Sequence, residues 1–254
     1  MLAELSLKLR SEHELGFWNS SLLQGVLMEH ADKEYAGKMH ETGLHPYSQC
    51  IIVDHDKNII WKIRTLDDEA YKAILEPWLS PTLKSFKIEK LDATVDITER
   101  VLVTRDSSDL LNRFYSSDTD RSIRVRLESP TAFKSNDRYV FMPELNLIFG
   151  SLMRKYSAAS SELDMTDQDT LEYINEHTYI SAYKIRSTTF PLEGVKIPSF
   201  MGEITLRFTG TDTMARYARL LLEYGEYSGV GIKTGIGMGA MKIVQGGKDE
   251  RKNS

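Results

Sequence analysis

The chain has 254 residues, a hydrophobic fraction of 41% and a net charge of −5, which suits one large or two ordinary globular domains. Its single cysteine, Cys50, excludes an internal disulfide framework and fits a reducing compartment. The N-terminus lacks the apolar region of a signal peptide, and no run of about 18 apolar residues is present, so we expect a cytoplasmic protein that does not span a membrane.

The charge is divided unevenly along the chain. Residues 1–120 hold 14 Lys and Arg against 21 Asp and Glu, whereas residues 121–254 hold 18 against 16. The most basic stretch, 121–158, carries seven basic and three acidic side chains. A local basic patch matters more for binding a polyanion than the overall charge does. Ordinary solvated side chains are the alternative interpretation of this stretch.

The first half of the chain predicts strands and helices in the order strand, helix, strand, strand, helix, strand. Alternating apolar residues indicate the first strand, and apolar residues at intervals of three to four indicate the first helix, with Asn19 as a candidate cap. Acidic residues 67–69 open the second helix. The predicted strands are 3–10, 48–53, 59–65 and a strand pair within 85–105, and a hairpin turn falls at 54–58.

The second half predicts the same order. Its elements are a strand at 123–127, a helix opened by Pro143 and Glu144, a short helix at 167–176, strands at 179–189 and 202–209 joined by a linker at 191–198, a helix at 212–227 and a strand at 240–244. The order is that of a ferredoxin-like unit. We therefore expect an α+β protein of two tandem ferredoxin-like (RRM-like) domains, 1–118 and 119–246, followed by a polar tail at 247–254. Such sheets often bind single-stranded RNA, but the fold alone does not establish a function.

A glycine-rich loop precedes the last strand. Five of the eleven residues from 229 to 239 are glycine, and Lys233 carries the only side-chain charge. The loop joins a helix to a strand, whereas dinucleotide-binding and P-loop motifs join a strand to a helix. Two interpretations follow: a flexible turn, or a backbone cradle for a polyanion.

Two of the six histidines share one glycine-bearing loop. His40 and His45 lie between Gly37 and Tyr47, and histidine can donate or accept a proton near neutral pH. We expect structural or solvated roles for the others, which are His13, His30, His55 and His177. His55 lies between two aspartates, but ligands from one tight turn converge poorly on a metal ion. The sequence therefore predicts no metal site and no cofactor.

Four stretches together resemble one protein family. The glycine-rich loop GVGIKTGIGMG at 229–239, the segment SPTAFK at 129–134, the segment FMGE at 200–203 and the histidine loop MHETGLHPYS at 39–48 occur in the order found in CRISPR-associated endoribonucleases. These enzymes, of the RAMP superfamily, cut precursor CRISPR RNA within its repeats. The resemblance covers most of the chain, and it implies tandem ferredoxin-like domains and RNA cleavage without a metal ion.

The resemblance also implies roles for particular residues. His40 matches the general acid or base of the family. His45 falls where many relatives have Lys or Arg, which implies phosphate contact or assistance in proton transfer. Some relatives use a tyrosine of the first helix, and Tyr35 is the candidate here, although its spacing differs. The expected RNA-binding residues lie in the glycine-rich loop and in the basic stretch: Gly231, Lys233, Gly235, Gly237, Arg124, Arg126, Lys134 and Arg138.

The expected partner is CRISPR repeat RNA. Cleavage would use the 2′-hydroxyl of the RNA and would leave a 2′,3′-cyclic phosphate and a 5′-hydroxyl. The glycine-rich loop is shared with noncatalytic RNA-binding subunits of CRISPR effector complexes, so a pure binding module is the alternative function. Association with such a complex and formation of a homodimer are both left open by the sequence.

Overall fold

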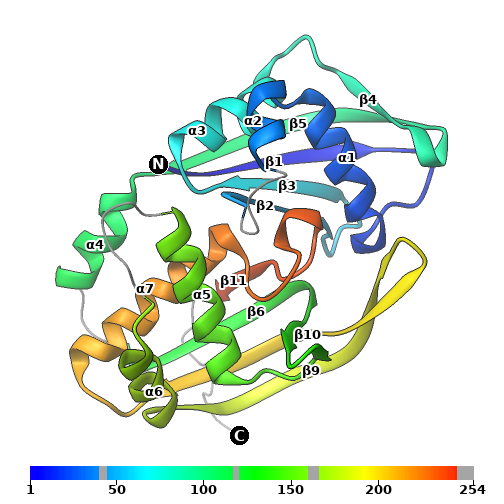
Figure 1. Ribbon diagram of the computed structural model, residues 1–254. Helices are drawn as coiled ribbons and strands as arrows, with labels where there is room; N and C mark the ends of the chain where they lie inside the picture. The colour runs from blue at the N-terminus through cyan, green and yellow to red at the C-terminus, as the bar shows by residue number, and fades with distance from the viewer. Residues whose placement is uncertain (40–44, 117–119, 160–165, 245–254) are drawn as a thin grey trace, which may run out of the picture.

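The computed structural model describes residues 1–39, 45–116, 120–159 and 166–244. The protein consists of two halves, one above the other in Figure 1, and each half pairs an antiparallel sheet with helices. One hydrophobic core lies in each half, between its sheet and its helices. The protein therefore belongs to the α+β class. None of the helices in the described ranges is long and apolar enough to cross a membrane.

The N-terminal sheet has the strand order β2-β3-β1-β5-β4. Alternation along the first strand places Leu5, Leu7 and Leu9 in the core, against Trp61 and Trp78. Each strand is antiparallel to its neighbours, and the predicted strands of this half are confirmed. The strands are β1 (Leu2–Arg10), β2 (Tyr47–Val53), β3 (Ile59–Thr65), β4 (Ser85–Ile88) and β5 (Ala93–Arg105).

Helices cover one face of this sheet. The predicted helix opening at 67–69 is confirmed, and Asp67 caps the helix, because its side chain accepts a hydrogen bond from the Ala70 N–H at 2.7 Å. The side chain of Asn19 instead accepts from the Gly16 N–H at 3.1 Å and makes no cap bond to α1. The elements are η1 (Phe17–Asn19), α1 (Ser20–His30), α2 (Lys33–Met39), α3 (Asp68–Ala70) running on into η2 (Tyr71–Leu75) and η3 (Glu76–Leu79), and η4 (Glu89–Leu91).

The C-terminal sheet has the strand order β11-β6-β10-β9. Ile123, Val125 and Leu127 alternate with exposed residues and pack against the helices. The strands are β6 (Ser122–Thr131), β9 (Thr178–Leu192), β10 (Val195–Phe208) and β11 (Met241–Val244), with a small hairpin of β7 (Phe133–Ser135) and β8 (Arg138–Val140). The helices are α4 (Ser107–Ser116), α5 (Leu145–Ala159), α6 (Gln168–Glu176) and α7 (Asp212–Ser228). The sequence did not predict α4 or the small hairpin.

The predicted linker at 191–198 is wrong, because these residues continue a long hairpin of β9 and β10 (Figure 1). The hairpin turns at Glu193 and Gly194, which have φ values of 48° and 82°, as a two-residue hairpin turn requires. Both prolines are tolerated. Pro191 lies on an edge strand, and Pro198 precedes Phe200, the first residue of β10 to pair with β6.

Polar contacts join the two halves. The carboxylate of Glu128 on β6 lies 3.3 Å from the Lys62 ammonium and 3.5 Å from the Arg64 guanidinium, both on β3. The Ser48 hydroxyl donates to the carbonyl oxygen of Tyr227 on α7 at 2.5 Å. Arg64 is only 2% exposed, so removing Glu128 would leave a buried charge without one of its counterions. These contacts set the position of one half relative to the other.

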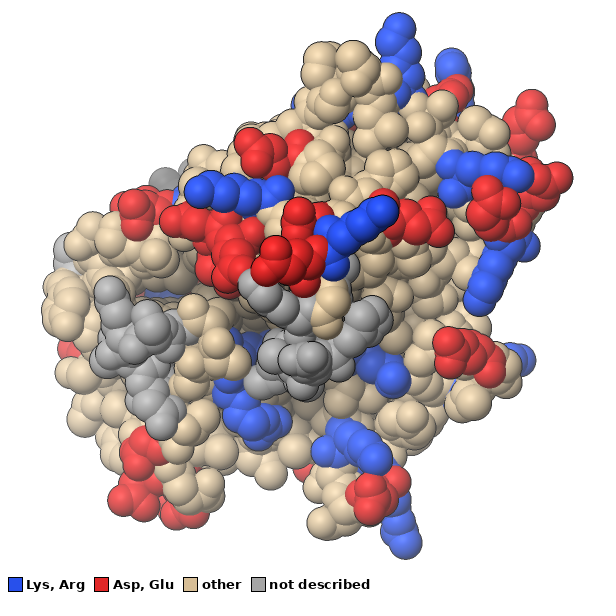
Figure 2. Space-filling model, turned by 45° about the horizontal axis from the view of Figure 1, so that its top comes forward, with Lys and Arg blue, Asp and Glu red and all other residues tan. Residues whose placement is uncertain are grey.

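The surface charge follows the division seen in the sequence. Figure 2 shows Asp and Glu side chains gathered in a band across the upper part of one face, with Lys and Arg side chains in the centre of the face below that band. The upper part of the view belongs to the N-terminal half, which holds the excess of acidic residues. On this face the acidic side chains are therefore concentrated in the upper band, and basic side chains lie near the centre below it.

Candidate functional site

The glycine loop, residues 229–239, lies between α7 and β11 and meets the end of β6 (Figure 1). The Gly239 N–H donates to the Pro130 carbonyl at 2.9 Å, and the Ile232 N–H donates to the Ala132 carbonyl at 3.0 Å. The N–H of Ala240 donates to the Ser129 hydroxyl at 2.9 Å. Two of the stretches that resemble the same family, 129–134 and 229–239, are therefore in direct contact.

The glycines allow backbone to pack closely on backbone. A Cβ on Gly231 would lie 2.3 Å from the Ala132 carbonyl oxygen, and one on Gly239 would lie 2.0 Å from the Val230 carbonyl oxygen. The Gly231 N–H donates to the Ser151 hydroxyl at 2.9 Å. These bonds lie inside the protein, so the loop is a packed element rather than a flexible turn.

The glycine loop also packs against the N-terminal half. A Cβ on Gly235 would lie 3.1 Å from the ring of Tyr47, and one on Gly237 would lie 2.1 Å from the Cβ of Ser20. Gly237 has a φ of 114°, which L side chains rarely adopt. Its N–H donates to the Thr234 carbonyl at 3.4 Å, within the 3-10 turn η5 (Thr234–Ile236) and its cap. The loop is thus wedged between the two halves.

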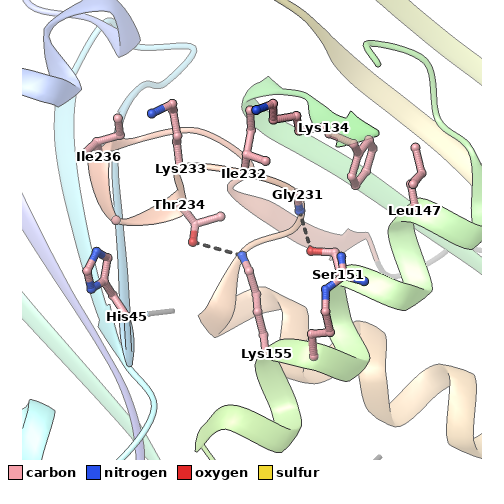
Figure 3. A pocket seen from close by; sticks show the side chains of 13 residues that line it. His45, Lys134, Leu147, Ser151, Lys155, Gly231, Ile232, Lys233, Thr234 and Ile236 are labelled. Atoms are coloured by element: carbon pink, nitrogen blue, oxygen red, sulfur yellow. Dashed lines mark hydrogen bonds between the residues drawn. The ribbon is translucent and has the colours of Figure 1, made fainter. Parts of the chain in front are cut away.

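A pocket of about 420 Å³ opens beside the glycine loop (Figure 3). It combines residues of both halves, from the segment before β2, from β7, from α5 and from the loop. The lining residues are His45, Phe133, Lys134, Leu147, Ser151, Arg154, Lys155, Gly231, Ile232, Lys233, Thr234, Gly235 and Ile236. Its four ionisable side chains other than His45 are Lys134, Arg154, Lys155 and Lys233, and all of them are basic. A concave surface lined by basic groups attracts anions.

Lys155 is the most buried of these basic side chains, with 8% of its surface exposed. Its ammonium donates to the carbonyl oxygens of Ser228 and Gly229 at 3.1 and 3.2 Å and to the Thr234 hydroxyl at 3.0 Å. Burial, with a smaller contribution from the charge of Arg154, lowers the pKa of Lys155 to about 7. The ammonium ties the end of α7 to η5.

The histidine loop is described only at its end. His45 borders the pocket, and its ring stacks on Tyr47 with the ring centroids 5.6 Å apart. Tyr47 is 2% exposed and lies against Gly235, so His45 and the glycine loop rest on the same side chain. His40 lies outside the described residues. Tyr35 is buried in the N-terminal core, and burial raises its pKa.

The four basic residues predicted to track RNA fall into two groups. Arg124 and Arg126 point to the open face of the C-terminal sheet, where Arg126 pairs with Glu203 at 2.6 Å. Lys134 lies on β7 and lines the pocket, and Arg138 begins the adjacent β8. The small hairpin therefore adds the Lys134 side chain to the pocket, while the sheet face is a separate surface.

Three of the four remaining histidines have local side-chain partners, and His13 is exposed. His30 packs on Trp78, and its Nδ1 lies 2.9 Å from the Val26 carbonyl oxygen. The Nδ1 of His177 lies 2.9 Å from the carbonyl oxygen of Tyr173. His55 is exposed and lies 3.3 Å from Asp56. Over the described ranges, no group of three or more His, Cys, Asp or Glu side chains is placed to hold a metal ion.

The contribution of α5 to the site was not predicted from the sequence. Ser151 and Lys155 are four residues apart and lie on one face of this helix, between the apolar residues Ile148, Leu152 and Tyr156. A serine and a lysine that interrupt the buried stripe of a helix are the signal that could have found them. Thr234, within the glycine loop, could be assigned only when its partner on α5 was known.

Comparison with known proteins now identifies the family. The family model of the CRISPR-associated endoribonuclease Cas6 matches residues 125–241. Cas6 of Mycobacterium tuberculosis is 34% identical over 221 residues, which cover 87% of this chain and 70% of that protein. Cas6 of Streptococcus thermophilus is 33% identical over 231 residues, which cover 90% of each protein.

Solved structures show the same fold. A Cas6 product complex aligns with a TM-score of 0.77 at 20% identity, over 96% of this chain and 100% of that one. Cas6 of Thermus thermophilus aligns with a TM-score of 0.71 at 21% identity, over 96% and 98% of the two chains. By sequence identity across nearly its whole length, the chain described here belongs to the Cas6 family of CRISPR-associated endoribonucleases.

Proposed function

We propose that this protein binds CRISPR repeat RNA in the pocket between its halves and cleaves it without a metal ion. The observation that carries the proposal is the pocket itself, which combines the end of the histidine loop with four basic side chains. The attacking 2′-hydroxyl forms a bond to the adjacent phosphorus, and the bond from phosphorus to the 5′-oxygen breaks. The products are a 2′,3′-cyclic phosphate and a 5′-hydroxyl.

Residues of the histidine loop carry out the proton transfers. A base removes the proton of the 2′-hydroxyl, and an acid gives a proton to the departing 5′-oxygen. His40 takes one of these two roles. His45, at the edge of the pocket, orients the phosphate or assists the transfer. The charge of Lys233 favours the additional negative charge of the transition state, because fixed positive groups stabilise charge that develops during reaction.

The remaining RNA contacts follow from the placement of the other residues. Lys134 and Arg138 extend the positive surface from the pocket along the small hairpin. Arg124 and Arg126 contact the RNA on the open face of the C-terminal sheet. Gly231, Gly235 and Gly237 act indirectly, because their close packing places Lys233 in the pocket. Each phosphate neutralised in this way releases counterions, so binding weakens as the salt concentration rises.

We further infer that the two halves are ferredoxin-like domains, 1–118 and 119–246, with α4 at the end of the first domain packed on α7 and on the core of the second. The C-terminal sheet order β11-β6-β10-β9 supports this, because it places the first strand of the half between its last and third strands. The N-terminal sheet repeats the arrangement as β5-β1-β3-β2, with β4 added at its edge. This topology belongs to the strand-helix-strand-strand-helix-strand motif.

The proposal is tested by incubating labelled repeat RNA with the protein in excess EDTA. We expect cleavage at one site within the repeat, with a cyclic phosphate on the upstream fragment, because histidine and lysine side chains supply the chemistry. End-group analysis before and after acid treatment distinguishes a cyclic phosphate from a linear one. Intact RNA that is retained on a filter would contradict the proposed cleavage chemistry and would indicate a binding function alone.

A further inference from the structure

Lys155 is a buried cation in the wall of the pocket, and the proposed cleavage does not use it. Its three hydrogen-bond partners are the carbonyl oxygens of Ser228 and Gly229 and the hydroxyl of Thr234. The two carbonyls end α7, where the helix dipole favours a positive charge. Among the residues that the structure describes, Lys155 forms no ion pair with a carboxylate. It is therefore held by neutral acceptors only.

The number of hydrogens on Lys155 determines how Thr234 bonds. A protonated ammonium has three hydrogens and can donate to all three partners, so the Thr234 oxygen accepts and its own hydrogen is left to donate elsewhere. A neutral amine has two hydrogens and one lone pair. Because carbonyls can only accept, the two hydrogens go to Ser228 and Gly229, and the lone pair then accepts the hydrogen of the Thr234 hydroxyl.

The rotamer of Thr234 is held by packing. Its methyl carbon lies 2.8 Å from the position of a Cβ on Gly229 and 3.1 Å from that of a Cβ on Gly239. With the methyl group fixed against these two glycines, the hydroxyl faces the Lys155 ammonium (Figure 3). Thr234 also follows Lys233 in the lining of the pocket. A hydrogen that Lys155 leaves free on this hydroxyl is therefore available at the pocket.

We propose that Lys155 is a positioning residue for the RNA, because its ammonium keeps the Thr234 hydroxyl as an acceptor and so directs the hydroxyl hydrogen to a phosphate oxygen in the pocket. This inference rests on the proposed function. Lys155 acts through Thr234 and does not itself touch the RNA. The phosphate oxygen accepts from Thr234 while Lys233 supplies positive charge beside it.

The protonation of Lys155 couples this contact to pH. Burial, followed by the charge of Arg154, lowers the pKa of Lys155 to about 7. A bound phosphate favours the charged form and raises this pKa, so RNA binding takes up a proton. Affinity is then greatest below pH 7 and falls by up to about tenfold per unit as the pH rises above it. The other ionisable groups around the pocket and against this part of α5 are His45, Lys134, Arg154, Lys233 and Tyr224.

The first test compares Thr234→Val with Thr234→Ser. Valine keeps the shape of the side chain and removes the hydroxyl, whereas serine keeps the hydroxyl. The ligand is repeat RNA with a 2′-deoxy substitution at the cleavage site, and its dissociation constant is measured at pH 7.0 and pH 8.5. We expect Thr234→Val to bind about 10- to 100-fold more weakly at pH 7.0, as for loss of a hydrogen bond to a charged group, and Thr234→Ser to bind within about threefold of wild type.

The second readout is the pH dependence itself, which a purely structural role would not change. Wild type should lose affinity between pH 7.0 and 8.5, a range over which an ordinary histidine, with a pKa of about 6.5, is already mostly neutral. Lys155→Met should bind weakly at both values and lose this dependence. Thr234→Val should lose it as well, and because the valine variant retains the ammonium, it gives a result even if Lys155→Met does not fold.

The outcomes separate the inference from the function on which it rests. Equal affinity and equal pH dependence in wild type and Thr234→Val would overturn the role of Lys155 and leave the proposed function standing. A wild-type protein that does not bind repeat RNA would overturn the proposed function and this inference with it. Weak, pH-independent binding by Thr234→Val, together with wild-type behaviour of Thr234→Ser, would support the inference.

Discussion

Replacing His40 by alanine is expected to slow single-turnover cleavage of repeat RNA by about 10²–10⁴-fold, the usual effect of losing one proton-transfer group. His40 and His45 belong to one loop of the sequence, and His45 borders the basic pocket beside the glycine loop. Because His40 acts on protons rather than on phosphate charge, the affinity for uncleaved RNA should remain almost unchanged. Rate and affinity are measured separately, by single-turnover cleavage in EDTA and by filter binding.

Two other histidine variants serve as controls for this prediction. His45→Ala should show a smaller defect, divided between binding and rate, because His45 is placed at the edge of the pocket. His55→Ala should leave both unchanged, since His55 is exposed in a hairpin turn and pairs only with Asp56 among the described contacts. If His40→Ala cleaved at the wild-type rate, His40 would not be the proton-transfer group, and His45 would become the candidate.

Gly237→Ala is expected to have the largest effect on stability. The added Cβ would lie 2.1 Å from the Cβ of Ser20, and the φ of 114° is unfavourable for any L side chain. Backbone strain of this kind costs about 1–3 kcal/mol, and overpacking costs about a further 1–3 kcal/mol. The free energy of unfolding, measured in urea, should fall accordingly. RNA binding should weaken too, because the glycine loop would separate from α1.

Gly194→Ala is the matched control for this substitution. Gly194 also has a positive φ, 82°, but no atom lies within 4 Å of its added Cβ. Its substitution should cost only the backbone strain, about 1–2 kcal/mol, and should leave RNA affinity unchanged. If the two variants were equally stable, the wedge of the glycine loop between the halves would contribute nothing to the fold.

Much of the fold could be predicted from local patterns in the sequence. Alternation identified β1 and β6, because each of these two strands buries one face along most of its length. The long hairpin was misjudged at 191–198, since Pro191 and Pro198 are usual signs of a loop. Here Pro191 lies on an edge strand and Pro198 lies beyond the part of β10 that pairs with β6. That tolerance depends on strand neighbours, which the local sequence does not contain.

The site could be predicted only in part. Glycine density marked the loop, and the family resemblance marked the histidine loop and residues 129–134. The purpose of the glycines was not predictable, because it depends on contacts with Ala132, Ser20 and Tyr47 from distant parts of the chain. Lys155 was hidden within an amphipathic helix, and its partners at the end of α7 are more than 70 residues away in sequence.

The central claim, cleavage by the RNA's own 2′-hydroxyl in a protein that needs no metal ion, is tested most directly by removing that hydroxyl. Repeat RNA with a single 2′-deoxy nucleotide immediately before the scissile phosphate is incubated with the wild-type protein in EDTA, beside the unmodified RNA. We expect both RNAs to bind with the same affinity, the unmodified RNA to be cut, and the deoxy RNA to remain intact at that position. Cleavage of the deoxy RNA at the same phosphate would contradict the mechanism, because the attacking oxygen would have to come from elsewhere.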